Sequence, residues 1–328
     1  MIFSRQYKVE GYEDKATSDA LSKSQSGSLL FLSGGGGTSS VTEGLGRVWQ
    51  SCEAQNLRVV DARMVNISED DVKLIARDLH AATGNINSSS NNNRSSSSGT
   101  SGGGVSSGPM IVLSVMGEES SQKIQALAYS FSSSSSSSSS SGLLPHGCNI
   151  LFAPDAAADG RLRGAFFGDT KQRLRSVVES AGKFSECACL CVLPSALGNG
   201  QAGSVLSELQ AALAPSNLSI SALRIANFSR SQAEEFVEVY KAVVPEYVEM
   251  INEFSKGPFV AVEVTGNDAV NKVREICGPR DIEVAKRVRP HSLRAKFGTS
   301  AGASGVHCTD LLEDGPLECE FIFSLISQ

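Results

Sequence analysis

The sequence predicts an α/β chain of the α+β, ferredoxin-like class, built from two tandem units with low-complexity insertions. Three observations predict this class: an internal repeat at a nearly constant offset, the same order of strands and helices in each half, and two polar stretches that interrupt the first half. At 328 residues the chain is long enough for two domains of ordinary size.

The internal repeat sets the architecture. Residues 29–79 align with residues 190–240 at an uninterrupted offset of 161, with low identity but matching apolar positions. Two further windows align in the same order, 108–117 with 257–266 and 149–155 with 304–310. Because three windows match in sequence, the repeat favours a shared fold of the two halves over two unrelated α/β domains.

Each half begins with a short apolar strand, a helix whose apolar residues lie three and four apart, and a second strand. These elements are predicted at residues 29–32, 41–48 and 57–65 in the first half and at 188–192, 205–209 and 218–226 in the second.

The second part of each half starts with Asn-x-Ser, which predicts a helix whose N-cap is Ser68 or Ser229. A Gly-Pro turn then leads into a β-rich run, expected at residues 110–115 and 259–264. The resulting order, strand–helix–strand–strand–helix–strand, is the ferredoxin-like plan.

Two stretches rich in Ser, Gly and Asn, residues 85–108 and 130–141, interrupt the first half. Neither stretch can bury enough apolar surface to offset its chain entropy, so we expect both to be disordered insertions.

Composition excludes several classes of function. The net charge of −6 disfavours a nucleic-acid-binding protein, since such proteins usually carry a basic face. No apolar run approaches the roughly 18–20 residues that span a bilayer, so no membrane partner is expected. The eight cysteines form no CxxC pair and no secreted-type framework, which indicates a reduced, intracellular setting.

Three of the cysteines, Cys187, Cys189 and Cys191, alternate along a predicted strand, so their thiols share one face. With no fourth ligand nearby in the sequence, small buried apolar side chains explain this pattern better than a metal site. We therefore predict no metal.

The C-terminal segment carries the residues of a phosphate-transfer site. His307 is placed as nucleophile, Arg294 as phosphate clamp and Thr309 as hydrogen-bond donor. Glu318 would fix the tautomer of the imidazole.

This order and spacing resembles the nucleoside diphosphate kinase family, whose signature is a basic Pro-Gly-Thr-Ile-Arg segment followed by Asn-x-x-His-x-Ser-Asp. The second half is similar to a two-domain ciliary type within that family, most closely in the segments AEEFVEVYKAVV at 233–244, REICGP at 274–279 and VHCTDLLEDG at 306–315. In that type a small β-rich module precedes the first domain, and residues 2–14 are similar to its last strands.

The resemblance implies three parts of the chain. Residues 1–27 are expected to be a remnant of the β-rich module or a linker, residues 28–182 a degenerate kinase-like domain, and residues 183–328 a second kinase-like domain.

The resemblance also implies a partly eroded site in the second half. The family's catalytic positions hold His307 and Glu318, and its nucleotide-binding positions hold Tyr240, Arg274, Arg294 and Thr309. Three further positions have changed: a lysine to Leu193, a threonine to Arg280 and an asparagine to Ser304. Loss of a lysine that contacts the transferring phosphate lowers the rate by on the order of 10²-fold or more.

In the first half the erosion is complete. The positions of the lysine, tyrosine, first arginine and histidine hold Leu32, Leu79, Gln125 and Phe152. We therefore expect this half to be a pseudo-domain.

Two functions remain in view. The resemblance implies a structural component of ciliary or flagellar doublet microtubules, a microtubule inner protein that binds α/β-tubulin and neighbouring inner proteins, requires no cofactor and does not form a hexamer. The alternative is a nucleoside diphosphate kinase or an autophosphorylating enzyme that uses His307 with Mg²⁺ and ATP or a nucleoside diphosphate. Since the lysine is absent from both halves, the sequence favours the structural protein.

Overall fold

The computed structural model describes residues 27–34, 38–81, 105–133, 144, 148–169, 171–179, 182, 184–300 and 302–325. The predicted N-terminal remnant up to residue 26 and the larger part of both predicted insertions lie outside these residues.

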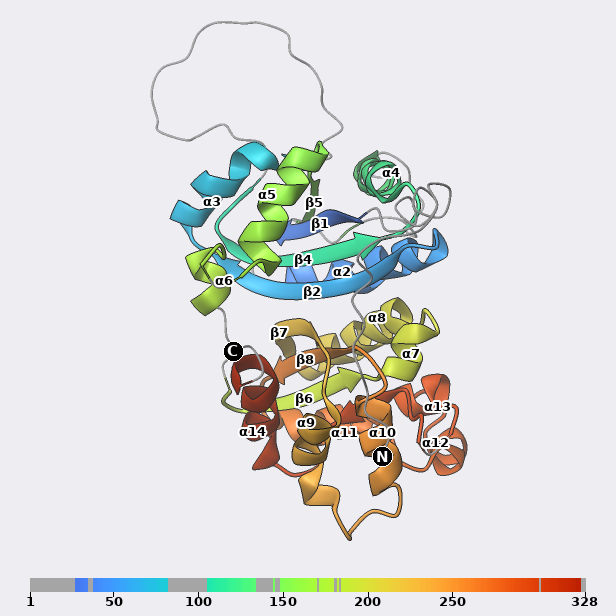
Figure 1. Ribbon diagram of the computed structural model, residues 1–328. Coiled ribbons are helices and arrows are strands. Elements are labelled where there is room, and N and C mark those ends of the chain that lie inside the picture. Colours follow the sequence, from blue (N-terminus) through green and yellow to red (C-terminus); the bar gives the residue numbers. More distant parts are fainter. Residues whose placement is uncertain are drawn as a thin grey trace, which may run out of the picture.

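The described strands form one sheet that runs through both halves of the chain (Figure 1). Its order is β3-β5-β1-β4-β2-β7-β8-β6-β9, and its neighbours pair antiparallel. The strands are β1 (Gly27–Gly34), β2 (Arg58–Ile67), β3 (His80–Ala81), β4 (Gly108–Met116), β5 (Cys148–Phe152), β6 (Cys187–Val192), β7 (Ser219–Ala226), β8 (Phe259–Thr265) and β9 (Val306–Cys308).

Helices cover both faces of the sheet. The described helices of the first half are α2 (Thr38–Ala54), α3 (Glu69–Ile75), α4 (Ser120–Ser133), α5 (Ala156–Phe167) and α6 (Arg175–Glu179). Those of the second half are α7 (Pro194–Gly198), α8 (Ala202–Leu213), α9 (Arg230–Phe236), α10 (Tyr247–Phe254), α11 (Ala269–Cys277), α12 (Ile282–Val288), α13 (Leu293–Phe297) and α14 (Asp314–Glu320).

The two faces of the sheet have different cores. On one face, apolar residues of α2, α4, α8 and α11 form a single core that extends across both halves. On the other face the core is divided: α3, α5 and α6 cover the first half, and α9, α10 and α14 cover the second. This second covered face holds the histidine site.

The structure repeats the same local features in both halves, which confirms the ferredoxin-like class. A β-bulge lies between Val59 and Asp61 in β2 and between Ile220 and Ala222 in β7, at the offset of 161 found in the sequence. The predicted N-caps are also confirmed. The Ser68 hydroxyl accepts from the amide of the third helical residue of α3, and Ser229 forms a capping box in α9.

A pseudo-twofold axis relates the halves. Arg63 of β2 faces Arg224 of β7, and these residues differ by 161, so a residue meets its own repeat equivalent. The same holds for Gly46 of α2, whose Cα packs directly on the backbone of Ser207 in α8. At a twofold interface, a residue on the axis contacts the equivalent residue of the other unit. The two halves therefore pair like a dimer within one chain.

The structure corrects the extents of both insertions. Gly108 begins β4, where it pairs with Ile67, so the first insertion does not reach residue 108. Helix α4 continues to Ser133, so the first serines of the second stretch are helical. The Ser130 and Ser132 hydroxyls donate to the carbonyls of Leu127 and Ala128, which explains why serine is tolerated there.

Among the described residues, the helices are too short or too polar for any of them to traverse a lipid bilayer.

Candidate functional site

His307 lies in the short strand β9, opposite Cys191 of β6. Its side chain is 3% exposed and points into the aromatic core of the second half. The imidazole packs edge-on against the rings of Phe236 and Phe254, at centroid distances of 5.4 and 5.5 Å. The sheet and these two rings hold the histidine in one orientation.

Glu318 connects His307 to Thr309. One carboxylate oxygen lies 3.3 Å from the His307 Nε2 atom, and the other accepts a 2.6 Å hydrogen bond from the Thr309 hydroxyl. The Thr309 Oγ1 atom in turn accepts from the Cys189 amide at 2.9 Å. A carboxylate at Nε2 favours the Nε2–H tautomer, which leaves the ring lone pair on Nδ1. The structure thus brings His307, Thr309 and Glu318 together, as predicted from the sequence.

Arg294 is buried close to this group. Its Nη1 atom donates to the Gly278 carbonyl at 2.7 Å and its Nε atom to the Val306 carbonyl at 3.3 Å. A third contact, 3.6 Å long, joins its Nη2 atom to the Cys308 sulfur. Arg294 therefore also links the end of α11 to β9 through these two hydrogen bonds.

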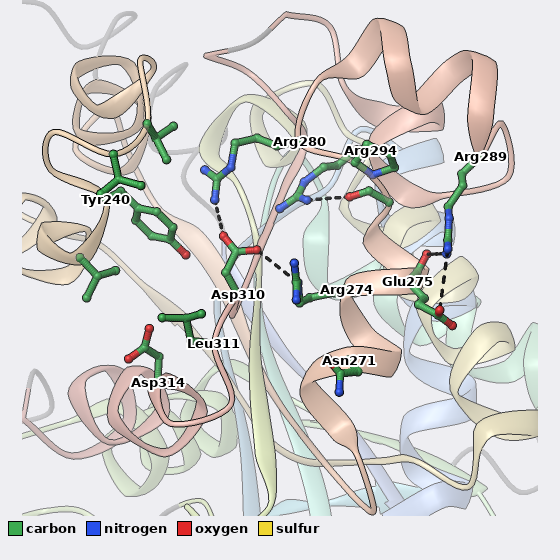
Figure 2. Close-up of a pocket in the computed structure, with 15 residues that line it drawn as sticks. Tyr240, Asn271, Arg274, Glu275, Arg280, Arg289, Arg294, Asp310, Leu311 and Asp314 are labelled. Carbon is green, nitrogen blue, oxygen red and sulfur yellow. Dashed lines mark hydrogen bonds and ion pairs between the residues drawn. The ribbon is translucent and has the colours of Figure 1, made fainter.

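A cavity of about 740 Å³ opens beside the histidine. Three of the four residues predicted at nucleotide-binding positions line it: Tyr240, Arg274 and Arg294. Thr309, the fourth, and His307 are not among its lining residues in the described part of the chain. Figure 2 shows arginines converging on this cavity from α11, α13 and the segment between α11 and α12.

Asp310 occupies the centre of the cavity wall and engages two of the arginines. Arg280 and Arg274 approach its carboxylate from opposite sides, the latter at 3.6 Å (Figure 2). Arg280 also lies over the Tyr240 ring, 4.7 Å from its centroid. Two guanidinium groups that could face a phosphate are thus already paired with a carboxylate.

Two of the changed family positions lack a phosphate-binding group. Leu193 precedes α7, is 4% exposed and packs in the same apolar core as Phe236 and Tyr240. The Ser304 hydroxyl donates to the Val306 carbonyl at 3.1 Å. Neither residue can supply the lysine's charge.

The first half has no equivalent of the histidine. Phe152 of β5 faces Leu30 of β1, and His307 faces Cys191, which corresponds to Leu30 in the repeat. Phe152 therefore occupies the nucleophile's place, and it is buried against the Tyr129 ring. Leu32 and Leu79 are buried in apolar cores as well.

The ion pairs of Asp310 with Arg274 and Arg280 contribute to the stability of the fold in a pH-dependent way. Burial raises the pKa of the Asp310 carboxyl, but the nearby Arg280, His307, Tyr240 and Arg294 side chains together outweigh burial, so its pKa lies below the usual value. Because the folded pKa is depressed, the contribution is present above the unfolded pKa of about 3.9 and is lost as pH falls through the folded pKa.

Asp310→Asn is therefore expected to lower the free energy of unfolding by about 1–2 kcal/mol at pH 7, with a shrinking difference from wild type below about pH 4. Urea denaturation of both proteins between pH 7 and pH 3 measures this. A difference that does not change with pH would exclude the ion pairs as its source.

Glu318→Ala is expected to lower the free energy of unfolding by about 1–3 kcal/mol, because the buried Thr309 hydroxyl loses its acceptor and His307 loses its partner. Glu320→Ala, an exposed carboxylate two residues further along the same helix, is the matched control and should change stability little. Equal effects of the two substitutions in denaturant titrations would show that the carboxylate does not hold the site.

Sequence reasoning missed the role of Asp310. The residue stands in the motif that identified the site, but its pairing with Arg274 and Arg280 depends on a turn that brings α11 and the following segment beside β9. The available signal in the sequence is that an acidic residue, Asp310, directly follows Thr309 among several arginine positions of the site.

The fold and the site define a nucleoside diphosphate kinase-like protein. The model of the nucleoside diphosphate kinase family matches residues 186–326. The Aquifex aeolicus nucleoside diphosphate kinase is 37% identical over 139 residues, which cover 42% of this chain and 94% of that enzyme. A crystal structure of the same enzyme covers 42% of this chain with a TM-score of 0.39. The chain belongs to the nucleoside diphosphate kinase family.

Within the family, the whole chain is similar to nucleoside diphosphate kinase homolog 7. The rat protein is 28% identical over 337 residues, which span 99% of this chain and 78% of the rat protein. The mouse protein is 32% identical over 234 residues, spanning 68% of this chain and 56% of the mouse protein. The resemblance noted from the sequence is therefore confirmed.

Proposed function

We propose that this protein is a structural, non-catalytic member of the family. The observation that carries the proposal is Leu193, an apolar residue in the buried core around His307, at the position where the family has its phosphate-contacting lysine. Leu32, the equivalent residue of the first half, is buried too. A site that must stabilise charge on a transferring phosphoryl group needs that cation.

Two further features support the proposal. His307 is nearly enclosed by aromatic rings, so a phosphoryl donor has little access to it. Asp310 pairs with both Arg274 and Arg280 and offsets one of their two positive charges, which lowers the attraction of the cavity for phosphate.

The location proposed for this protein is the doublet microtubule of a cilium or flagellum, inside the lumen, in contact with α/β-tubulin and other microtubule inner proteins. This part of the proposal rests on the resemblance to the two-domain ciliary type and on the whole-chain similarity to homolog 7. The pairing of the two halves through β2, β7, α2 and α8 supports a protein that does not assemble into hexamers, because each half already covers the other's pairing surface.

Fractionation of axonemes tests the location. An epitope-tagged chain is expected to remain with doublet microtubules through detergent and moderate salt and to leave only with agents that open the microtubule wall. Absence from the doublet fraction, or release by mild salt alone, would contradict a luminal position. Sedimentation of the purified chain is expected to show a monomer, and a hexamer would contradict internal pairing.

A second candidate function is favoured by one specific observation, the intact contacts of Glu318 with both His307 and Thr309. In this alternative the second half is a nucleoside diphosphate kinase or phosphorylates itself on His307, with Mg²⁺ and ATP. Tyr240, Arg274 and Arg294 would hold the nucleotide in the cavity of about 740 Å³. Labelling of His307 with γ-labelled ATP separates the two candidates.

A further inference from the structure

Two thiols and a carboxylate lie close together beneath α14, on the sheet face that also carries His307, and a third thiol lies next to them. The ligand atoms of Cys187, Glu263 and Cys319 all lie within 4.8 Å of one another. All three residues are buried, at exposures of 2%, 0% and 0%. The cluster comes from three elements far apart in the sequence, β6, β8 and α14.

The sheet places two thiols and the carboxylate side by side. Cys187 and Cys189 alternate along β6, so their side chains leave the same face. Glu263 of β8 is the direct cross-strand partner of Cys189, and directly opposed residues project from the same face. This register is independent of side-chain rotamers.

Helix α14 supplies the third thiol because it approaches β6 closely. A Cβ atom at Gly315 would lie 2.0 Å from the Cys187 carbonyl oxygen, so only glycine permits this approach. Cys319 follows Gly315 by four residues and therefore projects from the same helix face, toward β6. Its thiol interacts with the thiols of both Cys187 and Cys189.

The carboxylate of Glu263 is held in place. Its Oε1 atom accepts from the Phe184 amide at 2.7 Å, and its Oε2 atom accepts from the Ser221 hydroxyl at 2.5 Å. Outer hydrogen bonds of this kind orient the ligands of metal sites.

We propose that Cys187, Cys319 and Glu263 hold a structural zinc ion. Cys189, whose thiol contacts those of Cys319 and Cys191, would turn toward the ion as its fourth, tetrahedral ligand. Three sulfur donors and one carboxylate oxygen, all from buried side chains, fit the closed structural zinc sites of proteins. Soft thiolate donors exclude Mg²⁺ and Ca²⁺, which prefer oxygen. Binding replaces the thiol protons, which pass to the buffer.

The ion would join α14 to β6 and β8 directly behind the histidine site. Cys319 adjoins Glu318, and the Cys189 amide donates to Thr309. Zinc would thus fix Glu318 and its partner Thr309, whether or not His307 reacts. The sequence alone favoured small buried residues here because Glu263 and Cys319 lie far from the three alternating cysteines.

The test uses the full chain, reduced with a phosphine and freed of metal by a chelator. Titration with Zn²⁺ against a competing chelator is expected to show one tightly bound ion per chain and a raised unfolding temperature. Titration with Co²⁺ is expected to give the sulfur-to-cobalt charge-transfer absorption and the visible bands of a tetrahedral site. Absence of zinc binding, or a cobalt spectrum without charge transfer, would overturn the proposal.

Variants assign the ligands. Cys319→Ser and Glu263→Gln are each expected to weaken zinc binding by about 10- to 100-fold or more. Cys52→Ser, a buried cysteine on α2 in the first half, is the matched control and should bind zinc like wild type. Wild-type affinity in both site variants would refute the assignment. If a site variant does not fold, the cobalt spectrum of the wild-type chain still shows whether the chain holds a tetrahedral metal site with sulfur ligands.

Discussion

Gly46→Ala is expected to lower the free energy of unfolding by about 1–3 kcal/mol, although alanine is the better helix former. The added Cβ would lie 2.5 Å from the amide nitrogen of Ser207 and 2.8 Å from its Cα. These are backbone atoms of α8, so the two helices must separate. Separation opens the core that α2 and α8 share across both halves.

Gly160→Ala is the matched control for this substitution. Gly160 also lies inside a helix, α5, but its Cβ would meet nothing within 4 Å. This variant is expected to stabilise the chain by about 0.5–1 kcal/mol through the ordinary helix preference. Both variants replace a helical glycine by alanine, but they are expected to change the free energy of unfolding in opposite directions, which urea denaturation measures. Equal signs would contradict the tight packing of the two halves.

Restoring the three changed family positions is expected to raise phosphoryl transfer by about 10²-fold or more over the wild-type chain. The variant combines Leu193→Lys, Arg280→Thr and Ser304→Asn. The first change returns the cation, and the second removes a guanidinium that lies over Tyr240 and pairs with Asp310. Transfer from ATP to a nucleoside diphosphate measures the gain.

His307→Ala in the same restored background is the control, and it should abolish the gained transfer. Denaturant titration checks that a lysine at the buried position 193 has not unfolded the chain. A folded triple variant that transfers no more phosphate than wild type would show that the loss of these three groups is not what limits the site.

Much of the fold follows from local signals that the sequence carries twice. Ser68 and Ser229 cap helices because a side-chain oxygen before a helix satisfies its exposed amides, a local effect that needs no tertiary information. The repeat likewise anticipates that Phe152 stands where His307 stands in the other half. The predicted extents of the insertions are wrong, since β4 begins at Gly108 and helix α4 continues into the serine run to Ser133.

The contacts that define the site depend on long-range packing and do not follow from the sequence. Asp310 meets Arg280 only because β9 and the end of α11 lie side by side. Cys319 reaches Cys187 only because Gly315 lets α14 approach β6. Residue types and spacing name such candidates, but the distances between elements decide whether they meet.

Labelling of the purified wild-type chain with γ-labelled ATP and Mg²⁺ tests the central claim most directly. Phosphohistidine is labile to acid and stable to alkali, so these two treatments identify it, and an active nucleoside diphosphate kinase serves as the positive control. A structural, non-catalytic protein should show no such label above that of His307→Ala. Acid-labile, alkali-stable label on wild type that disappears in His307→Ala would contradict the account and establish the second half as an enzyme.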